Sequence, residues 1–170
     1  SGMFLCGFTD ISMGVHMVPF AQEAGLSTAV IALSLAILGI TNIAGSFLTG
    51  IASDHFGRKN PLLFAYIARA IAYAFLIFAH GNLALLGFAA LAGLTWIATG
   101  PLTFSLTSDI YGLRHLGVLS GMVQMSHQIG AGLGIYLYGL MRDVTGDYHL
   151  AFIVGGAALV SAALITMGLS

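Results

Sequence analysis

Six apolar stretches, each close to 20 residues long, follow one another along this chain of 170 residues with only short polar links between them. A helix needs roughly 20 mostly apolar residues to cross the hydrocarbon core of a bilayer. The sequence therefore predicts an all-α integral membrane protein in which residues 1–170 form a single bundle of six transmembrane helices. The expected spans are residues 2–21, 28–49, 61–79, 83–106, 117–141 and 150–169.

The composition fits a chain surrounded by lipid and excludes several other classes of protein. Hydrophobic residues make up 58% of the chain and charged residues only 6%, against about a quarter in soluble domains. Five basic residues and a net charge of -1 cannot form the basic stripe that binds nucleic acid. The single cysteine, Cys6, excludes an internal disulfide, and no histidines have His-x-x-x-His spacing, so we expect no metal and no cofactor.

The prolines predict where two of the helices begin or bend. Pro61 suits the first turn of the third span, where the N–H group that proline lacks would have no helical partner. Gly100-Pro101 interrupts the fourth apolar stretch, and a proline inside a helix removes a backbone hydrogen bond. We therefore expect the fourth helix to be kinked at Gly100-Pro101.

The basic residues in the links predict the orientation, because cytoplasmic loops of membrane proteins are enriched in lysine and arginine. Arg58, Lys59 and Arg114 lie in the links after the second and fourth spans, whereas the other three links hold only Arg142. Alternate links lie on the same side of the bilayer. The sequence thus places both termini in the cytoplasm, and we expect the cell membrane as the location.

The link between the second and third spans carries a motif that indicates a family. The segment from Gly50 to Lys59 resembles the G-x-x-x-D-R/K-x-G-R/K-R/K signature of the major facilitator superfamily, a group of secondary transporters with twelve helices in two six-helix halves. His55 departs from it, because histidine is only partly protonated near neutral pH where the family usually has a fixed cation. The alternative is an ordinary basic cytoplasmic loop. The residues that match the signature are Gly50, Asp54, Gly57, Arg58 and Lys59.

The resemblance also indicates which half of such a transporter the chain matches. The first half often has an arginine within its fourth helix, whereas residues 83–106 contain no charge. The links with Asp109 and Arg114 and at residues 143–148 resemble the second half of the monocarboxylate-porter and oxalate/formate-antiporter branch. That branch often has an aspartate and an arginine on the eighth helix of the full transporter, where this chain has only Thr41 and Asn42.

What the resemblance implies is a C-terminal half built from two inverted three-helix repeats. Its function would be secondary active transport of a small organic solute, such as a monocarboxylate anion, by symport or antiport and with proton coupling left open. Alternating access rocks two six-helix halves around a site at the bilayer midplane. A second half is therefore an expected partner, either an N-terminal half or a second copy of the chain, and no enzymatic activity is expected.

Two charged residues lie within the expected spans, where an ionisable side chain is costly and calls for a partner or for water. Asp10 is midway along the first span, where it is expected either to couple transport in the central cavity, or to bond neighbouring hydroxyls such as Thr9 and Ser12, or to lie nearer the cytoplasmic water. Arg69 lies about 16 Å beyond Arg58 along a helix. The third helix of this fold is peripheral, so we expect Arg69 to pair structurally or to extend toward the membrane surface.

The resemblance implies that the first, second, fourth and fifth helices line the transport cavity. Trp96, Thr99 and Thr103 have helical spacing along one face, unless the threonines only bond their own helix and Trp96 is simply packed. A second polar stripe runs along one face of the fifth span, with Gln128 at its border. The stripe consists of Ser120, Gln124 and His127, which have helical spacing. The candidate substrate or coupling residues are Asp10, His16, Asn42, Trp96, Thr99, Thr103, Ser120, Gln124 and His127.

Two other classes of function compete with transport. An intramembrane Ser/His hydrolase would use Ser120 and His127, but seven residues of one helix separate them by about 10 Å, too far for a direct hydrogen bond. A membrane assembly protein would use the glycine pairs of residues 117 and 121 and of residues 130 and 134 for close helix packing. Such pairs are frequent in membrane proteins of many kinds, so they do not discriminate.

Overall fold

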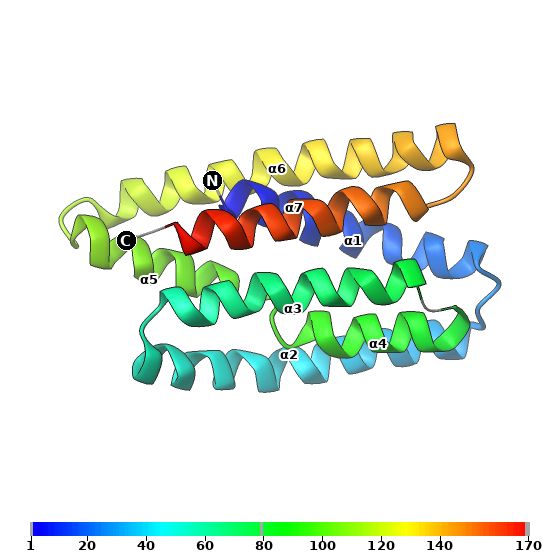
Figure 1. Cartoon of the computed structure of the whole chain (residues 1–170), viewed down its shortest axis with the longest axis horizontal. Helices are drawn as coiled ribbons and strands as arrows, with labels where there is room; N and C mark the ends of the chain where they lie inside the picture. The colour runs from blue at the N-terminus through cyan, green and yellow to red at the C-terminus, as the bar shows by residue number, and fades with distance from the viewer. Residues whose placement is uncertain (1, 79, 169–170) are drawn as a thin grey trace.

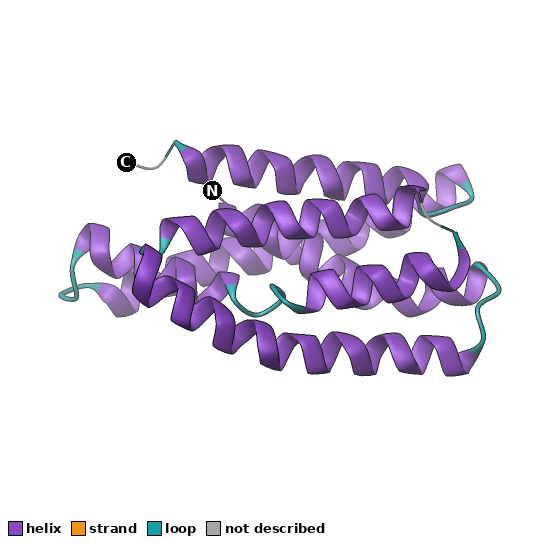
Figure 2. Ribbon diagram, turned by 60° about the horizontal axis from the view of Figure 1, so that its bottom comes forward, coloured by secondary structure: helices purple, strands orange, loops and turns teal. Residues whose placement is uncertain are grey.

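The structure is a computed structural model that describes residues 2–78 and 80–168, and within these ranges it contains seven α-helices and no strand. The helices run alongside one another in an elongated bundle (Figures 1 and 2). They are α1 (Gly2–Glu23), α2 (Thr28–Phe56), α3 (Lys59–Phe78), α4 (Gly81–Gly93), α5 (Thr99–Tyr111), α6 (Leu116–Thr145) and α7 (His149–Met167).

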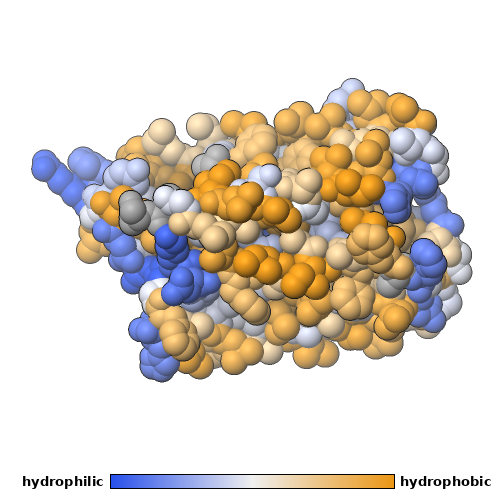
Figure 3. All heavy atoms as spheres, in the orientation of Figure 1, coloured by the Kyte–Doolittle hydropathy of each residue, from blue (hydrophilic) through white to orange (hydrophobic). Residues whose placement is uncertain are grey.

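Four of the described helices, α1, α2, α3 and α7, are long and apolar enough to cross a membrane. They coincide with the first, second, third and sixth expected spans. Figure 3 shows apolar side chains across the middle of one face of the bundle and hydrophilic side chains at its two ends. This distribution is the one that a bilayer imposes on a spanning protein.

The fourth expected span is two helices, α4 and α5, joined by a turn over residues 94–98. The break comes before Gly100-Pro101, so the predicted position of the kink is wrong. Pro101 instead occupies the first turn of α5, where the missing N–H group costs no helical hydrogen bond. The dipeptide thus helps to begin a helix, and each of the two helices has only 13 residues.

The fifth expected span is α6, a helix of 30 residues that is about 45 Å long. Its length suffices for a membrane, but it is not among the four helices that are also apolar enough. Polar side chains along α6 account for the difference. The arrangement in six spans and two inverted repeats therefore stays a prediction.

Glycines let α1 and α6 approach until their backbones touch. A Cβ atom added at Gly130 would lie 2.1 Å from the Phe4 carbonyl oxygen, and one added at Gly7 would lie 2.0 Å from the His127 carbonyl oxygen. Gly134 packs in the same way against Phe8. Small residues at such positions allow close helix packing in membranes.

A second close approach joins α2 to the end of α4. A Cβ atom at Gly45 would lie 1.9 Å from the Leu94 carbonyl oxygen, and one at Gly93 would lie 2.0 Å from the Thr41 hydroxyl oxygen. The turn after α4 therefore rests directly on the backbone of α2. Elsewhere α2 is largely exposed, with Phe47 at 72%.

The packing of α1 on α6 generates a prediction with a control on the same helix. We expect Gly130→Ala to lower the free energy of unfolding by about 1–3 kcal/mol, because the added Cβ forces α1 and α6 apart. Gly121→Ala should change it by less than about 1 kcal/mol, because nothing lies within 4 Å of its Cβ position. Unfolding of the chain in detergent micelles measures both, and equal losses would contradict the assignment of Gly130 to the contact.

Candidate functional site

A buried ion pair between α1 and α3 lies at the centre of the candidate site. The Nη1 atom of Arg69 lies 2.5 Å from the carboxylate of Asp10, and both side chains are almost fully buried, at 1% and 6% exposed. Removing two charges from water is costly, and the cost is offset only where the geometry is good and the remaining polar atoms are bonded. The partners of Arg69 are therefore decisive.

Arg69 also bonds the turn between α4 and α5. Its Nη2 atom donates to the Thr95 carbonyl and, at 2.7 Å, to the Trp96 carbonyl, while Nε lies 3.3 Å from the Thr95 hydroxyl. The carbonyls at the end of a helix lack helical donors and must find others in a membrane. The guanidinium of Arg69 supplies these donors and so connects α1 to the break.

The surroundings of the pair differ from what the sequence suggested for each residue alone. Arg69 does not extend to the surface, and its structural pairing is with Asp10, a partner that the sequence did not identify. The Thr9 hydroxyl lies 3.4 Å from the Asp10 carboxylate, as one alternative expected, but the buried hydroxyl of Ser12 has no hydrogen-bond partner among the described residues. The signal that could have predicted the pair is that Asp10 and Arg69 are two opposite charges within the expected apolar spans.

Cys6 and His127 complete a cluster around the Asp10 carboxylate. The Cys6 thiol donates to Asp10 at 3.2 Å and also lies 3.2 Å from the Thr99 hydroxyl. A sulfur, a carboxylate oxygen and an imidazole nitrogen from Cys6, Asp10 and His127 lie within 4.8 Å of one another, a set that can bind a soft metal ion. However, Arg69 places a fixed positive charge against both carboxylate oxygens, which opposes a second cation. We therefore assign Cys6 and Asp10 to hydrogen bonding, with the His127 imidazole lying beside them.

The polar stripe of α6 reaches this cluster through His127. The imidazole Nδ1 atom lies 3.1 Å from the Gln128 Oε1 atom, and the side chain is half-buried. Ser120 is half-buried and Gln124 exposed further along the helix. The stripe thus forms a polar surface that begins beside the ion pair and continues outward on an otherwise apolar bundle.

The three candidates on the fourth span do not share one helical face, because Trp96 lies in the turn and not in a helix. Thr99 is buried and accepts from Arg69 at 3.3 Å. The Thr103 hydroxyl donates to the Thr99 carbonyl at 2.7 Å, which is the self-bonding that the alternative interpretation expected. The Trp96 indole stands edge-on to Phe88, with ring centroids 6.4 Å apart.

Asn42 and His16 lie in different places. The Asn42 side-chain oxygen accepts from the Ile97 N–H group at 3.4 Å, so Asn42 contacts the break from the side of α2. His16 bonds the Tyr148 hydroxyl at 3.1 Å and the Ile135 carbonyl at 3.0 Å, where α1 meets α6 and the start of α7. The structure therefore brings Asp10, Thr99 and His127 together, with Asn42 and Trp96 at the break.

The family motif lies at the end of the bundle where α2, α3 and α5 meet. Arg58 donates to the Asp109 carboxylate and, at 2.9 Å, to the Ser105 carbonyl, so the two predicted cytoplasmic links are joined by an ion pair. Gly57 has a φ of 73°, a backbone conformation that favours glycine and lets the chain turn before Lys59 begins α3. A cleft of about 300 Å³ beside this pair includes Gly50 and exposed Asp54 in its lining. Arg114 is exposed after α5.

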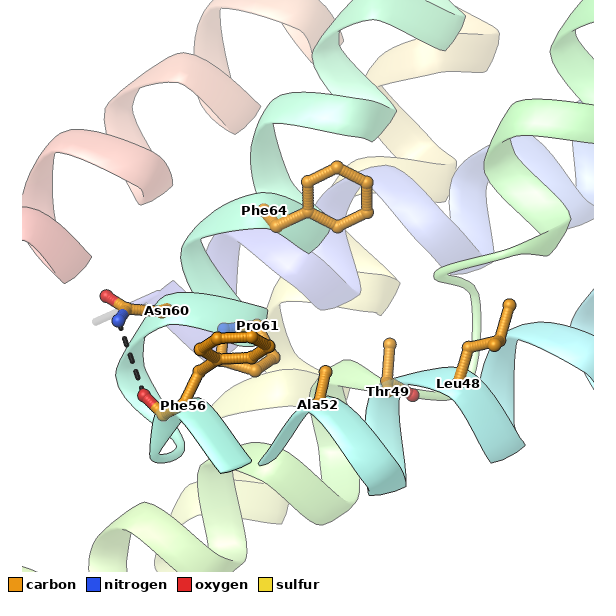
Figure 4. A pocket seen from close by; sticks show the side chains of 7 residues that line it. All are labelled: Leu48, Thr49, Ala52, Phe56, Asn60, Pro61 and Phe64. Atoms are coloured by element: carbon orange, nitrogen blue, oxygen red, sulfur yellow. Dashed lines mark hydrogen bonds between the residues drawn. The ribbon is translucent and has the colours of Figure 1, made fainter. Parts of the chain in front are cut away.

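An apolar groove of about 350 Å³ lies between α2 and α3 near the same end. Asn60 at its rim donates to the Phe56 carbonyl at 3.3 Å. The groove offers almost no polar atoms, so it does not suit a polar solute. The apolar residues that line it are Leu48, Ala52, Phe56, Pro61 and Phe64 (Figure 4).

The ion pair generates a prediction about stability. We expect Asp10→Asn to lower the free energy of unfolding by about 3–5 kcal/mol, because it leaves a buried guanidinium without a counter-charge. Glu23→Gln on the same helix breaks the exposed pair with Arg142 and should cost no more than about 1 kcal/mol. Unfolding of both variants in detergent tests this, and the interpretation fails if Asp10→Asn is no more destabilising than Glu23→Gln.

Comparison with known proteins agrees with the motif. The sequence model of the Major Facilitator Superfamily matches residues 1–169. The chain is 30% identical over 175 residues to "Uncharacterized MFS-type transporter YcxA" of Bacillus subtilis (strain 168), an alignment that covers 99% of this chain and 40% of that protein.

Proteins named as monocarboxylate transporters are also similar to the chain. Monocarboxylate transporter 13 of Rattus norvegicus is 31% identical over 90% of this chain and 37% of its own length. Monocarboxylate transporter 12-B of Danio rerio is 27% identical over 97% of this chain and 36% of its own length. The chain thus spans about two-fifths of the length of these relatives. With a matching family model, the signature at residues 50–59 and helices able to span a membrane, the chain is an integral membrane protein that belongs to the Major Facilitator Superfamily.

Proposed function

We propose that the chain is the C-terminal half of a secondary transporter that moves a small organic anion, such as a monocarboxylate, by alternating access. The observation that supports this best is the polar stripe on α6, which leads from the exposed face of the bundle to the broken helix and the buried ion pair. Broken helices beside a polar surface are typical of substrate sites in transporters. The names of several relatives point to monocarboxylates as the substrate class.

The groups near the site suit a carboxylate ligand in a particular way. Arg69 is fully used by Asp10 and by the carbonyls of the break, so it offers no free donor to a substrate. Recognition of the anion then falls to His127, Gln124 and the indole N–H of Trp96, together with groups from a second half. Coupling to a proton would involve the Asp10 carboxylate or the His127 imidazole.

A second six-helix half completes the proposed transporter, because alternating access requires two bodies that move against each other. The relatives are more than twice as long as the chain, which leaves room for such a half. Exposed apolar side chains on α2 and the polar stripe of α6 are the surfaces available to it. The same proposal includes the arrangement of this chain as one bundle of six transmembrane helices, built from two inverted three-helix repeats.

We also propose a plasma-membrane location with both termini in the cytoplasm. Figure 1 shows that the start of α1, the end of α7 and the links with Arg58 and Arg114 lie toward one end of the bundle. Basic links on one side support a cytoplasmic assignment for that end. There the ion pair of Arg58 with Asp109, beside Asp54, would close the cytoplasmic side in the outward-open state.

The two competing functions have less support. Ser120 and His127 lie two turns apart on one helix, and the relatives named above are transporters, so a Ser/His hydrolase is not favoured. An assembly role does not account for the polar stripe, and Gly130 and Gly134 already pack α6 on α1 within the chain. We therefore expect no enzymatic activity.

The proposal is tested by transport in the protein that contains this chain. Gln124→Leu and Trp96→Leu should each raise the KM for uptake of a radiolabelled monocarboxylate such as pyruvate by roughly tenfold, since losing one donor to a carboxylate costs about 1–3 kcal/mol. Ser161→Ala on α7 is the control, because that exposed hydroxyl donates to its own helix at the Ala157 carbonyl. If Gln124→Leu and Trp96→Leu both leave the KM for uptake unchanged at normal expression, the proposal is wrong.

A further inference from the structure

The break between α4 and α5 is bonded from two sides. On the side of α2, Asn42 accepts from the Ile97 N–H group, and Gly45 lies directly under the Leu94 carbonyl. On the opposite side, the carbonyls of Thr95 and Trp96 point toward α3 and accept from one side chain, Arg69. The conformation of this turn is therefore not determined by its own backbone hydrogen bonds alone.

We propose that Arg69 is a positioning residue that sets the conformation of the α4–α5 break, and that Asp10 on α1 controls this conformation by holding the guanidinium. The proposal concerns the buried pair as a connection between α1 and the break. It does not depend on the substrate or on transport itself.

The inventory of donors supports this role. A guanidinium has five N–H groups in a rigid planar fork. Nε serves the Thr95 hydroxyl, and Nη2 serves the carbonyls of Thr95 and Trp96 with the Thr99 hydroxyl close by. Nη1 serves the two oxygens of Asp10 and also lies 3.4 Å from the Cys6 sulfur. Every edge of the fork is used, so the position of Asp10 fixes the orientation in which the other edges meet the break.

Two consequences follow from this rigid connection. A shift of α1 relative to α3 moves the guanidinium and so changes the hydrogen bonds of the Thr95 and Trp96 carbonyls. A ligand that weakens the bond between Asp10 and Arg69 has the same effect. Such a ligand would act next to Cys6 and His127, which lie beside the Asp10 carboxylate. Ligand binding at the polar stripe of α6 would then change the conformation of the break, although no residue of the stripe needs to contact the break.

The chain contains its own reporter for this effect. Trp96 is its single tryptophan, it lies in the break, and its carbonyl is a partner of Arg69. Its indole is half-buried against Phe88. A loosened break should expose the indole to water, which shifts its emission to longer wavelength and makes it easier to quench.

The experiment measures Trp96 emission and acrylamide quenching in the folded chain, in detergent micelles or lipid nanodiscs. Asp10→Asn removes the charge that holds the guanidinium, and Arg69→Lys keeps a charge that cannot serve Asp10 and both carbonyls together. We expect each to raise the quenching constant by about twofold, as a released turn would. Glu23→Gln on α1 should leave it unchanged, because it affects only the exposed pair with Arg142.

The readout separates positioning from simple stabilisation. A pair that only stabilises the fold would lower the unfolding temperature of these variants and leave Trp96 quenching in the folded state unchanged, and that result would overturn the proposal. If neither charge variant gives monodisperse protein, the double variant Thr95→Val, Thr99→Val decides. It removes two hydroxyl acceptors of Arg69 at constant volume, and the proposal expects a smaller rise in quenching, whereas wild-type quenching and emission would contradict it.

Discussion

A single guanidinium meets two requirements that a membrane imposes at the centre of this bundle. A charge in a low-dielectric interior needs a counter-charge, and helix carbonyls exposed by a break need donors. Arg69 has both kinds of partner, with Asp10 on one edge and the carbonyls of Thr95 and Trp96 on the other. The two sets of contacts offset each other's cost. The ion pair holds the guanidinium donors in place, and the carbonyls accept from its remaining N–H groups.

The rest of the bundle positions these groups through close backbone contacts. Gly7 and Gly130 bring α1 against α6, which places Asp10 beside His127. Gly45 and Gly93 bring α2 against the end of α4, which fixes the other side of the break. The polar stripe therefore lies beside the carboxylate, and hydrogen bonds connect the carboxylate, the guanidinium and the broken helix.

Much of this architecture could be predicted from the sequence because hydropathy along a chain is a local property. The membrane class, four of the spans and the family motif follow from runs of apolar residues and from glycines and charges in one link. The position of the break could not, because Gly100-Pro101 can either interrupt a helix or begin one. The helix ends at residue 93 and restarts at residue 99, where Arg69 and Asn42 bond the backbone of the turn between them.

The pairings within the site were also beyond the sequence. Asp10 and Arg69 are separated by 59 residues, and Arg58 and Asp109 by 51. The sequence singled out Asp10 and Arg69 as charges within spans, and Arg58 and Asp109 as residues of the links. Which faces of the helices meet depends on packing that one sequence does not reveal. The contacts of Cys6 and Thr95 with the ion pair were not predicted, since neither residue type is unusual in a membrane segment.

The central claim is that Asp10 and the α4–α5 break share the guanidinium of Arg69. Solid-state NMR on the chain in lipid bilayers, with labelled aspartate carboxyls, Thr95 and Trp96 carbonyls and arginine guanidino nitrogens, measures these contacts directly. The account predicts dipolar couplings from the Arg69 side chain to the Asp10 carboxyl carbon and to both backbone carbonyl carbons. Coupling to the carboxyl alone, with none to the Thr95 and Trp96 carbonyls, would contradict it.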